Sequence, residues 1–162
     1  MTENRHKTDL LFVPVFLGLC FLAAFAGQFL SGPMPNEWYS QLDKPWFTPP
    51  GWIFAPVWTG LYICMGVAAW LVWQNRKTKR VIQPLVAFSI QLLLNAAWSP
   101  LFFGLKNPGL AFAEIAALLM AIMITTLAFF RVFTTAGWLM IPYFGWVSFA
   151  AILNWSIWQL NR

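Results

Sequence analysis

Polar side chains that could hold a ligand stand inside an otherwise apolar stretch, residues 82–103. Gln91 and Asn95 are four residues apart, so a helix would place both amides on one face, with Trp98 on or near it. A carboxamide in an apolar interior can hydrogen-bond a bound molecule, or it can link two helices. The spacing leaves both interpretations open.

Standard catalytic motifs are absent from the sequence. It has no GxSxG, no HExxH, no phosphate-binding glycine loop and no pair of carboxylates within an apolar stretch. The only histidine, His6, lies in the charged N-terminal tail, and Cys20 and Cys64 lack metal-ligand spacing. The sequence therefore predicts no metal site and favours a binding or transport protein.

Glu114 is the single acid inside an apolar stretch. It lies within two turns of the expected start of its helix, so its carboxylate is expected to reach water at the membrane surface. A role in proton relay is the alternative interpretation.

Residues 38–58 are rich in tryptophan and proline, and they separate two apolar segments. Pro49 and Pro50 cannot donate backbone hydrogen bonds and restrict their neighbours, which predicts a stiff loop from Trp38 to Gly51 and a helix from Trp52. Indoles suit a membrane interface, so the loop could be an aromatic anchor. A long, stiffened loop could equally be a lid over a pocket, because such loops are often functional.

The composition identifies lipid as the main solvent of this chain. Of its 162 residues, 60% are hydrophobic and 9% charged, whereas soluble domains have about 25% charged residues. Five windows are long enough to span the bilayer core as helices of about 20 residues. They lie near 10–30, 53–74, 82–103, 109–130 and 136–160.

These windows predict one all-α integral membrane domain over residues 1–162, a bundle of five transmembrane helices. They are apolar on every face, which excludes the alternation of barrel strands. The first window is expected to remain as a helix, because Phe25, Gln28 and Phe29 spoil a signal-peptide cleavage site.

Basic residues are unevenly shared between the two ends of such a bundle. One end carries Arg5, Lys7, Arg76, Lys77, Lys79, Arg80 and Arg131, and the other carries Lys44, Lys106 and Arg162. The positive-inside rule therefore predicts a cytoplasmic N-terminus in a multi-pass protein. A bacterial cell membrane is the expected location, and the sequence leaves an organellar membrane open as the alternative. The cluster at 76–80 could also bind anionic lipid, although orientation alone would explain it.

The last apolar window combines residues that suit a flat aromatic ligand. Trp146 and Ala150 share a helix face at four-residue spacing, and Asn154 lies at a depth similar to that of Asn95. An indole, a small side chain and nearby amides can together line such a site.

Three blocks of sequence resemble the TspO family, the tryptophan-rich sensory proteins related to the mitochondrial translocator protein. They are WYSQLDKPWFTPPGWIFAPVWTGLY at 38–62, QLLLNAAWSPLFF at 91–103 and PYFGWVSFAAILNWSIWQLN at 142–161. The resemblance implies a five-helix bundle, usually a homodimer. It also implies binding of porphyrins such as protoporphyrin IX or haem. Some members of the family also bind sterols or isoquinoline-type ligands. The family pocket lies under the first loop, which here makes 31–51 the lid.

The resemblance also implies which residues form the site. Trp58 and Asn95 match residues that hydrogen-bond a ligand, and Trp38 and Trp146 match tryptophans implicated in light- and oxygen-dependent porphyrin breakdown. Trp98 is added to the set because it lies on or near the helix face of Asn95. The full set of expected ligand-binding residues is Trp38, Tyr39, Phe54, Ala55, Trp58, Asn95, Trp98, Trp146, Ala150 and Leu153.

One departure bears on sterols. The family's C-terminal sterol pattern contains a tyrosine, whereas this chain has LNWSIWQLNR with Trp155.

The leading hypothesis is a membrane protein that binds tetrapyrroles in transport, buffering or sensing, with no obligatory cofactor and no nucleic-acid partner. A porphyrin-degrading enzyme that uses Trp38 and Trp146 is the alternative, and an interaction subunit is a third. With no histidine in any span, we expect the macrocycle to stack on rings rather than to bind through its metal.

Overall fold

The computed structural model describes residues 11–32 and 37–162. Residue 10 of the first expected span, positions 33–36 of the expected lid, and Arg5, His6 and Lys7 lie outside the described residues. The long helices are α2 (Val13–Ser31), α4 (Phe54–Gln74), α5 (Ile82–Ser99), α6 (Pro108–Val132) and α7 (Thr134–Leu160). Shorter elements are α3 (Glu37–Gln41), η1 (Gly51–Ile53), η2 (Asn75–Lys77) and η3 (Pro100–Gly104).

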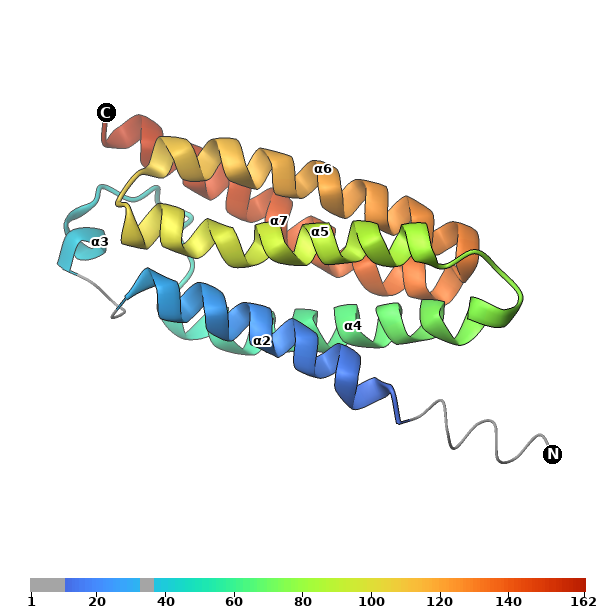
Figure 1. Cartoon of the computed structure of the whole chain (residues 1–162). Helices are drawn as coiled ribbons and strands as arrows, with labels where there is room; N and C mark the ends of the chain where they lie inside the picture. The colour runs from blue at the N-terminus through green and yellow to red at the C-terminus, as the bar shows by residue number, and fades with distance from the viewer. Residues whose placement is uncertain (1–10, 33–36) are drawn as a thin grey trace.

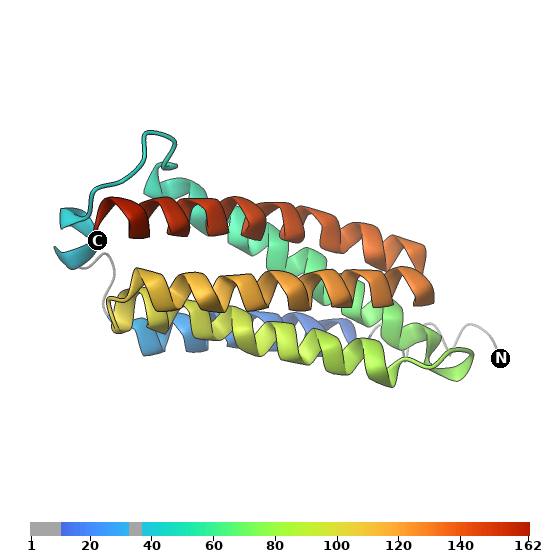
Figure 2. The same ribbon diagram turned by 90° about the horizontal axis from the view of Figure 1, so that it is seen from above.

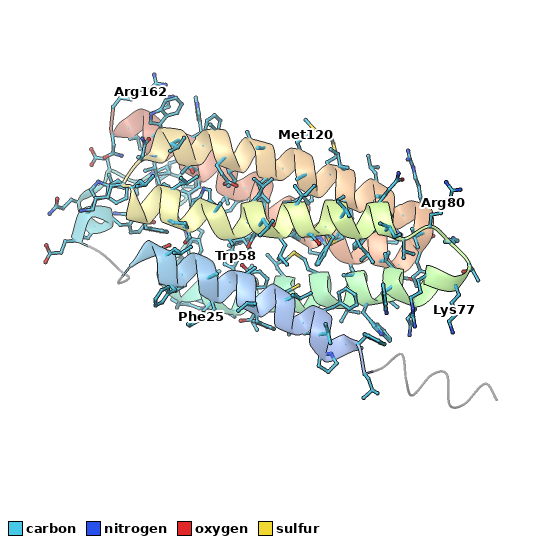
Figure 3. The ribbon with its side chains drawn as sticks, viewed as in Figure 1. Phe25, Trp58, Lys77, Arg80, Met120 and Arg162 are labelled. Atoms are coloured by element: carbon cyan, nitrogen blue, oxygen red, sulfur yellow. The ribbon has the colours of Figure 1, made fainter. Side chains whose placement is uncertain are left out.

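The predicted all-α class is confirmed. Within the described residues, 5 helices are long and apolar enough to cross a membrane. Their outward faces carry large apolar side chains, such as Phe25 and Met120, which are 67% and 54% exposed (Figure 3). Such faces avoid water but suit lipid. The protein is thus a multi-pass membrane bundle.

The helices lie side by side along one common direction (Figures 1 and 2). Helix α6 packs along α5 and α7, α2 packs on α4 and α5, and α4 packs on α7. Gly27 of α2 lies so close to α5 that a Cβ atom there would stand 2.9 Å from the Ala96 carbonyl oxygen. A small residue is therefore required at this crossing.

The two ends of the bundle differ in charge and in the segments that lie over them. At the basic end, defined by Arg76, Lys77, Lys79, Arg80 and Arg131, α4 connects to α5 and α6 connects to α7 (Figure 1). At the opposite, loop end lie residues 37–53, the α5–α6 connection and the C-terminus.

Local structure at the loop end differs from the expectation at one point. The stretch from Trp38 to Gly51 was expected to be loop throughout, but Trp38 and Tyr39 lie in the short helix α3. At Pro100, helix α5 continues into a π-turn, in which the Leu105 amide donates to the Pro100 carbonyl at 2.8 Å. This turn buries Phe102, which is 2% exposed, beneath α3.

Candidate functional site

The loop that follows α3 is tied to the end of α7. The Asp43 amide donates to Oδ1 of Asn161 at 3.0 Å, and Nδ2 of Asn161 donates to the Asp43 carbonyl at 2.9 Å. Further along the loop, the Phe47 ring meets Phe149 of α7 at 6.3 Å between centroids. Paired bonds to one amide fix the position of the loop on α7.

Helix α3 adds two rings to an aromatic cluster at the loop end. Trp38 and Tyr39 meet the Phe102 ring edge-on at 5.7 and 6.1 Å, and Trp98 stacks on the same ring at 5.1 Å. Leu153 of α7 is buried in this cluster. Burial raises the pKa of the Tyr39 phenol above its ordinary value, so the ring stays neutral at physiological pH.

Trp146 of α7 has an unsatisfied hydrogen-bond donor. Its ring contacts Phe54 at 5.8 Å and Phe149 at 5.6 Å. Its Nε1 is buried and has no hydrogen-bond partner among the described residues. A buried N–H without an acceptor is costly, so this position suits a ligand that brings one.

Asn95 lies at the centre of a hydrogen-bonded chain that joins three helices. The Tyr62 hydroxyl of α4 donates to its Oδ1 at 2.7 Å, and its Nδ2 donates to the Tyr143 hydroxyl of α7 at 2.9 Å. Trp58 covers this chain, stacking on Tyr62 at 5.4 Å and meeting Tyr143 at 6.3 Å. An amide offers two donors and two lone pairs, so one of each is used here.

Sequence reasoning missed the two tyrosines as partners of Asn95. A signal was present, since a phenol within a span needs a hydrogen-bond partner. Tyr62 follows Trp58 by four residues, and Tyr143 precedes Trp146 by three, so each shares a helix face with an expected site residue.

The other amides serve different contacts. Gln91, fully buried one turn from Asn95, has only the Met65 sulfur, at 3.9 Å, as a partner for Nε2, and its Oε1 is unpartnered. Asn154 accepts from Trp98 Nε1 at 3.0 Å and donates to the Pro108 carbonyl at 2.8 Å. The indole donor of Trp98 is therefore engaged within the protein.

The expectation that Glu114 reaches water is wrong. Both of its carboxyl oxygens are buried and have no hydrogen-bond partner in the part of the chain that the structure describes. Its neighbours Ala111, Ile115 and Leu118 are buried as well, so this face of α6 looks into the bundle. The face that a side chain occupies, rather than its distance from the helix end, decides whether it can reach the surface.

The structure brings the expected site residues together in two neighbouring groups. The loop-end group contains Trp38, Tyr39, Phe54, Trp98 and Leu153. The deeper group contains Trp58, Asn95, Trp146 and Ala150. Phe54 connects the two groups, because it packs in the loop-end group and also against Trp146. Ala55 belongs to neither group and is exposed.

Comparison with known proteins identifies the family. The family model described as TspO/MBR matches residues 16–159. The chain is 44% identical to the tryptophan-rich protein TspO of Chlorobaculum tepidum, a match that covers 94% of this chain and 98% of the relative. It is 40% identical to tryptophan-rich protein TspO of Archaeoglobus fulgidus, covering 85% and 88% of the two chains. It is also 38% identical to the translocator protein of Homo sapiens, covering 87% and 85%. The chain therefore belongs to the TspO/MBR family.

Proposed function

We propose that this protein binds tetrapyrroles such as protoporphyrin IX between the aromatic residues at its loop end, for transport, buffering or sensing. The observation that carries the proposal is the buried, partnerless Nε1 of Trp146 beside Phe54 and Phe149. A flat macrocycle offers large faces for contact with such rings, and its propionates offer acceptors for an N–H donor.

The loop that follows α3 acts as the lid of this site. Its bonds to Asn161 hold it against α7, while Trp38 and Tyr39 of the preceding helix bring their rings onto Phe102. A ligand that entered beneath the lid would meet Trp146 and Phe54 first and Trp58 further into the bundle.

Trp58 and Asn95 hold a polar group of the ligand at the deeper end. Asn95 retains one donor and one lone pair beyond its bonds to Tyr62 and Tyr143. Because Trp58 stacks on Tyr62, its indole is held in place by the same chain of bonds.

The macrocycle is held by its faces and edges rather than by its metal. The chain has one histidine, His6, and the thiols of Cys20 and Cys64 stand on α2 and α4 among apolar residues. Axial ligation of haem iron uses His, Cys, Met or Tyr. Of the three tyrosines, Tyr62 and Tyr143 are engaged with Asn95, and Tyr39 packs edge-on against Phe102.

Titration of the purified protein with metal-free protoporphyrin IX and with haem tests this proposal. We expect both to quench tryptophan fluorescence with similar affinity. Much tighter binding of haem, with an absorption spectrum of a protein-ligated iron, would overturn the stacking model. Absence of saturable quenching by either compound would overturn tetrapyrrole binding itself.

A further inference from the structure

A groove lies between α5 and α6 at the basic end, far from the aromatic site. Its volume is about 400 Å³. Three cations line its mouth, Lys79, Arg80 and Arg131, and its deeper wall is formed by Ala87, Ile124 and Ala128. Figure 3 shows Arg80 at this end of the bundle, opposite Arg162.

The cations are held together by a contact between the two sides of the groove. The Lys79 ammonium donates to the Val132 carbonyl at the end of α6. This bond draws the segment that precedes α5 towards the end of α6 that carries Arg131. Basic groups from the α4–α5 connection and from the last turn of α6 thereby surround one opening.

Arg80 and Arg131 are exposed at this mouth, and the described part of the chain offers them no acid. The acids in the described residues are Glu37, Asp43 and Glu114, all towards the loop end. Arg131 is 17 residues from Glu114 along α6, a separation of about 25 Å in a helix. The positive charge of the groove is therefore not compensated by these side chains.

The start of α5 adds to this positive potential. Its first turn has no side-chain cap, so no capping side chain offsets the positive end of the helix dipole, which faces the same region. Gln83 of that turn also lines the groove and can donate a hydrogen bond. Helix dipole and side chains together favour an anion here.

The lining of the groove changes from basic at its mouth to apolar further along the helices, as an amphiphilic ligand requires. Ile124 lies seven residues before Arg131 on α6, about 10 Å deeper along the helix. The small side chains of Ala87 and Ala128 leave space between the helices on the way to that depth. A molecule that fills the groove must therefore be anionic at the basic end and apolar towards the middle of the bundle.

We propose that this groove binds an anionic phospholipid. Its phosphate contacts Arg80 and Arg131, and one acyl chain runs along Ala87, Ile124 and Ala128. A cluster of basic residues next to a span can act through orientation alone, but orientation requires no apolar hollow beneath the charges. The basic side chains, the positive end of the α5 dipole and the apolar groove together favour a lipid as the ligand of this site.

The test is thermal unfolding of the full chain, delipidated in neutral detergent and titrated with phosphatidylglycerol or phosphatidylcholine. We expect phosphatidylglycerol to raise the melting temperature and phosphatidylcholine to have little effect. Arg80→Gln with Arg131→Gln should weaken the apparent affinity on the order of 30-fold, since each basic side chain near anionic lipid contributes roughly fivefold. Lys77→Gln is the matched control, because it removes a charge from the same end without lining the groove.

Two further arms separate lipid binding from simpler explanations. Ala128→Leu keeps every charge but fills the groove, and it should also weaken the phosphatidylglycerol effect. Glycerol phosphate, a headgroup without acyl chains, should not reproduce it. The proposal is overturned if Lys77→Gln weakens binding as much as the double variant, or if either groove variant binds normally. Equal stabilisation by free glycerol phosphate would also overturn it.

Discussion

The Tyr62 hydroxyl donates a hydrogen bond to Oδ1 of Asn95 at 2.7 Å, inside a bundle whose outer surface faces lipid. Nδ2 of the same amide donates to Tyr143, so a single side chain connects α4, α5 and α7. Because Trp58 stacks on Tyr62, this connection also fixes the inner wall of the proposed ligand site.

The first prediction compares Asn95 with Gln91, two buried amides one turn apart on α5. Asn95→Leu leaves two buried hydroxyls without partners and should lower the free energy of unfolding by about 1–3 kcal/mol. Gln91→Met replaces an amide whose oxygen is unpartnered, so stability should stay equal or rise. Thermal unfolding in detergent measures both. An equal loss in the two variants would contradict the assignment of their contacts.

Asn95→Leu also tests the ligand contact proposed for this amide. Protoporphyrin affinity, measured below the melting temperature of the variant, should fall roughly 5- to 150-fold if a buried hydrogen bond is lost. Unchanged affinity with reduced stability would restrict Asn95 to linking the helices.

The second prediction concerns the lid. Asn161→Ala removes both bonds to Asp43 and should speed protoporphyrin entry and release, with a smaller effect on the equilibrium affinity. Stopped-flow tryptophan quenching measures both rates, and Gln159→Ala, in the last turn of α7, is the control. Unaltered rates in the Asn161 variant would show that the loop does not gate the site.

The third prediction concerns Glu114, whose carboxyl oxygens are buried without partners. Glu114→Met keeps a side chain of similar length and removes the unsatisfied groups, so the melting temperature should rise. A clear fall would mean that the acid has a partner that stabilises the folded bundle.

The fourth prediction concerns orientation. Thr78 and Leu160 are exposed at opposite ends of the bundle, since Thr78 lies in the α4–α5 connection at the basic end and Leu160 is the last residue of α7. A cysteine at 78 should react only with reagents that reach the cytoplasm, and a cysteine at 160 only with external ones. Labelling of both positions from the same side would contradict an odd number of spans, and the reverse pattern would contradict a cytoplasmic N-terminus.

The five long helices could be predicted from sequence because lipid requires each span to be apolar and to satisfy its own backbone. The burial of Asn95 was predictable for the same reason, since a polar side chain within a span turns inward. Its partners were not, because spacing along α5 says nothing of which neighbour faces it. The bonds between Asp43 and Asn161 join residues 118 positions apart, and no local pattern indicates them.

The aromatic site shows the same limit. The spacing of Trp146 and Ala150 predicted a shared helix face, whereas the contact of Trp146 with Phe54 depends on how α4 packs against α7. The Trp98 donor is engaged by Asn154, whereas the Trp146 donor has no partner among the described residues. This difference becomes visible only once α5 and α6 are placed beside α7.

The most direct test of the account is the affinity of Trp146→Phe for protoporphyrin IX, measured from absorbance and from quenching of the remaining tryptophans. Phenylalanine keeps an aromatic ring and removes the buried donor, so affinity should fall roughly 10- to 100-fold, as expected for a bond to a charged propionate. Trp155→Phe, on the exposed face of the same helix, should bind like the parent protein. Without ligand, Trp155→Phe should keep the parent melting temperature, and Trp146→Phe should not fall below it, because it removes the unsatisfied donor. Equal affinities of the two variants would contradict the claim that Trp146 holds the ligand.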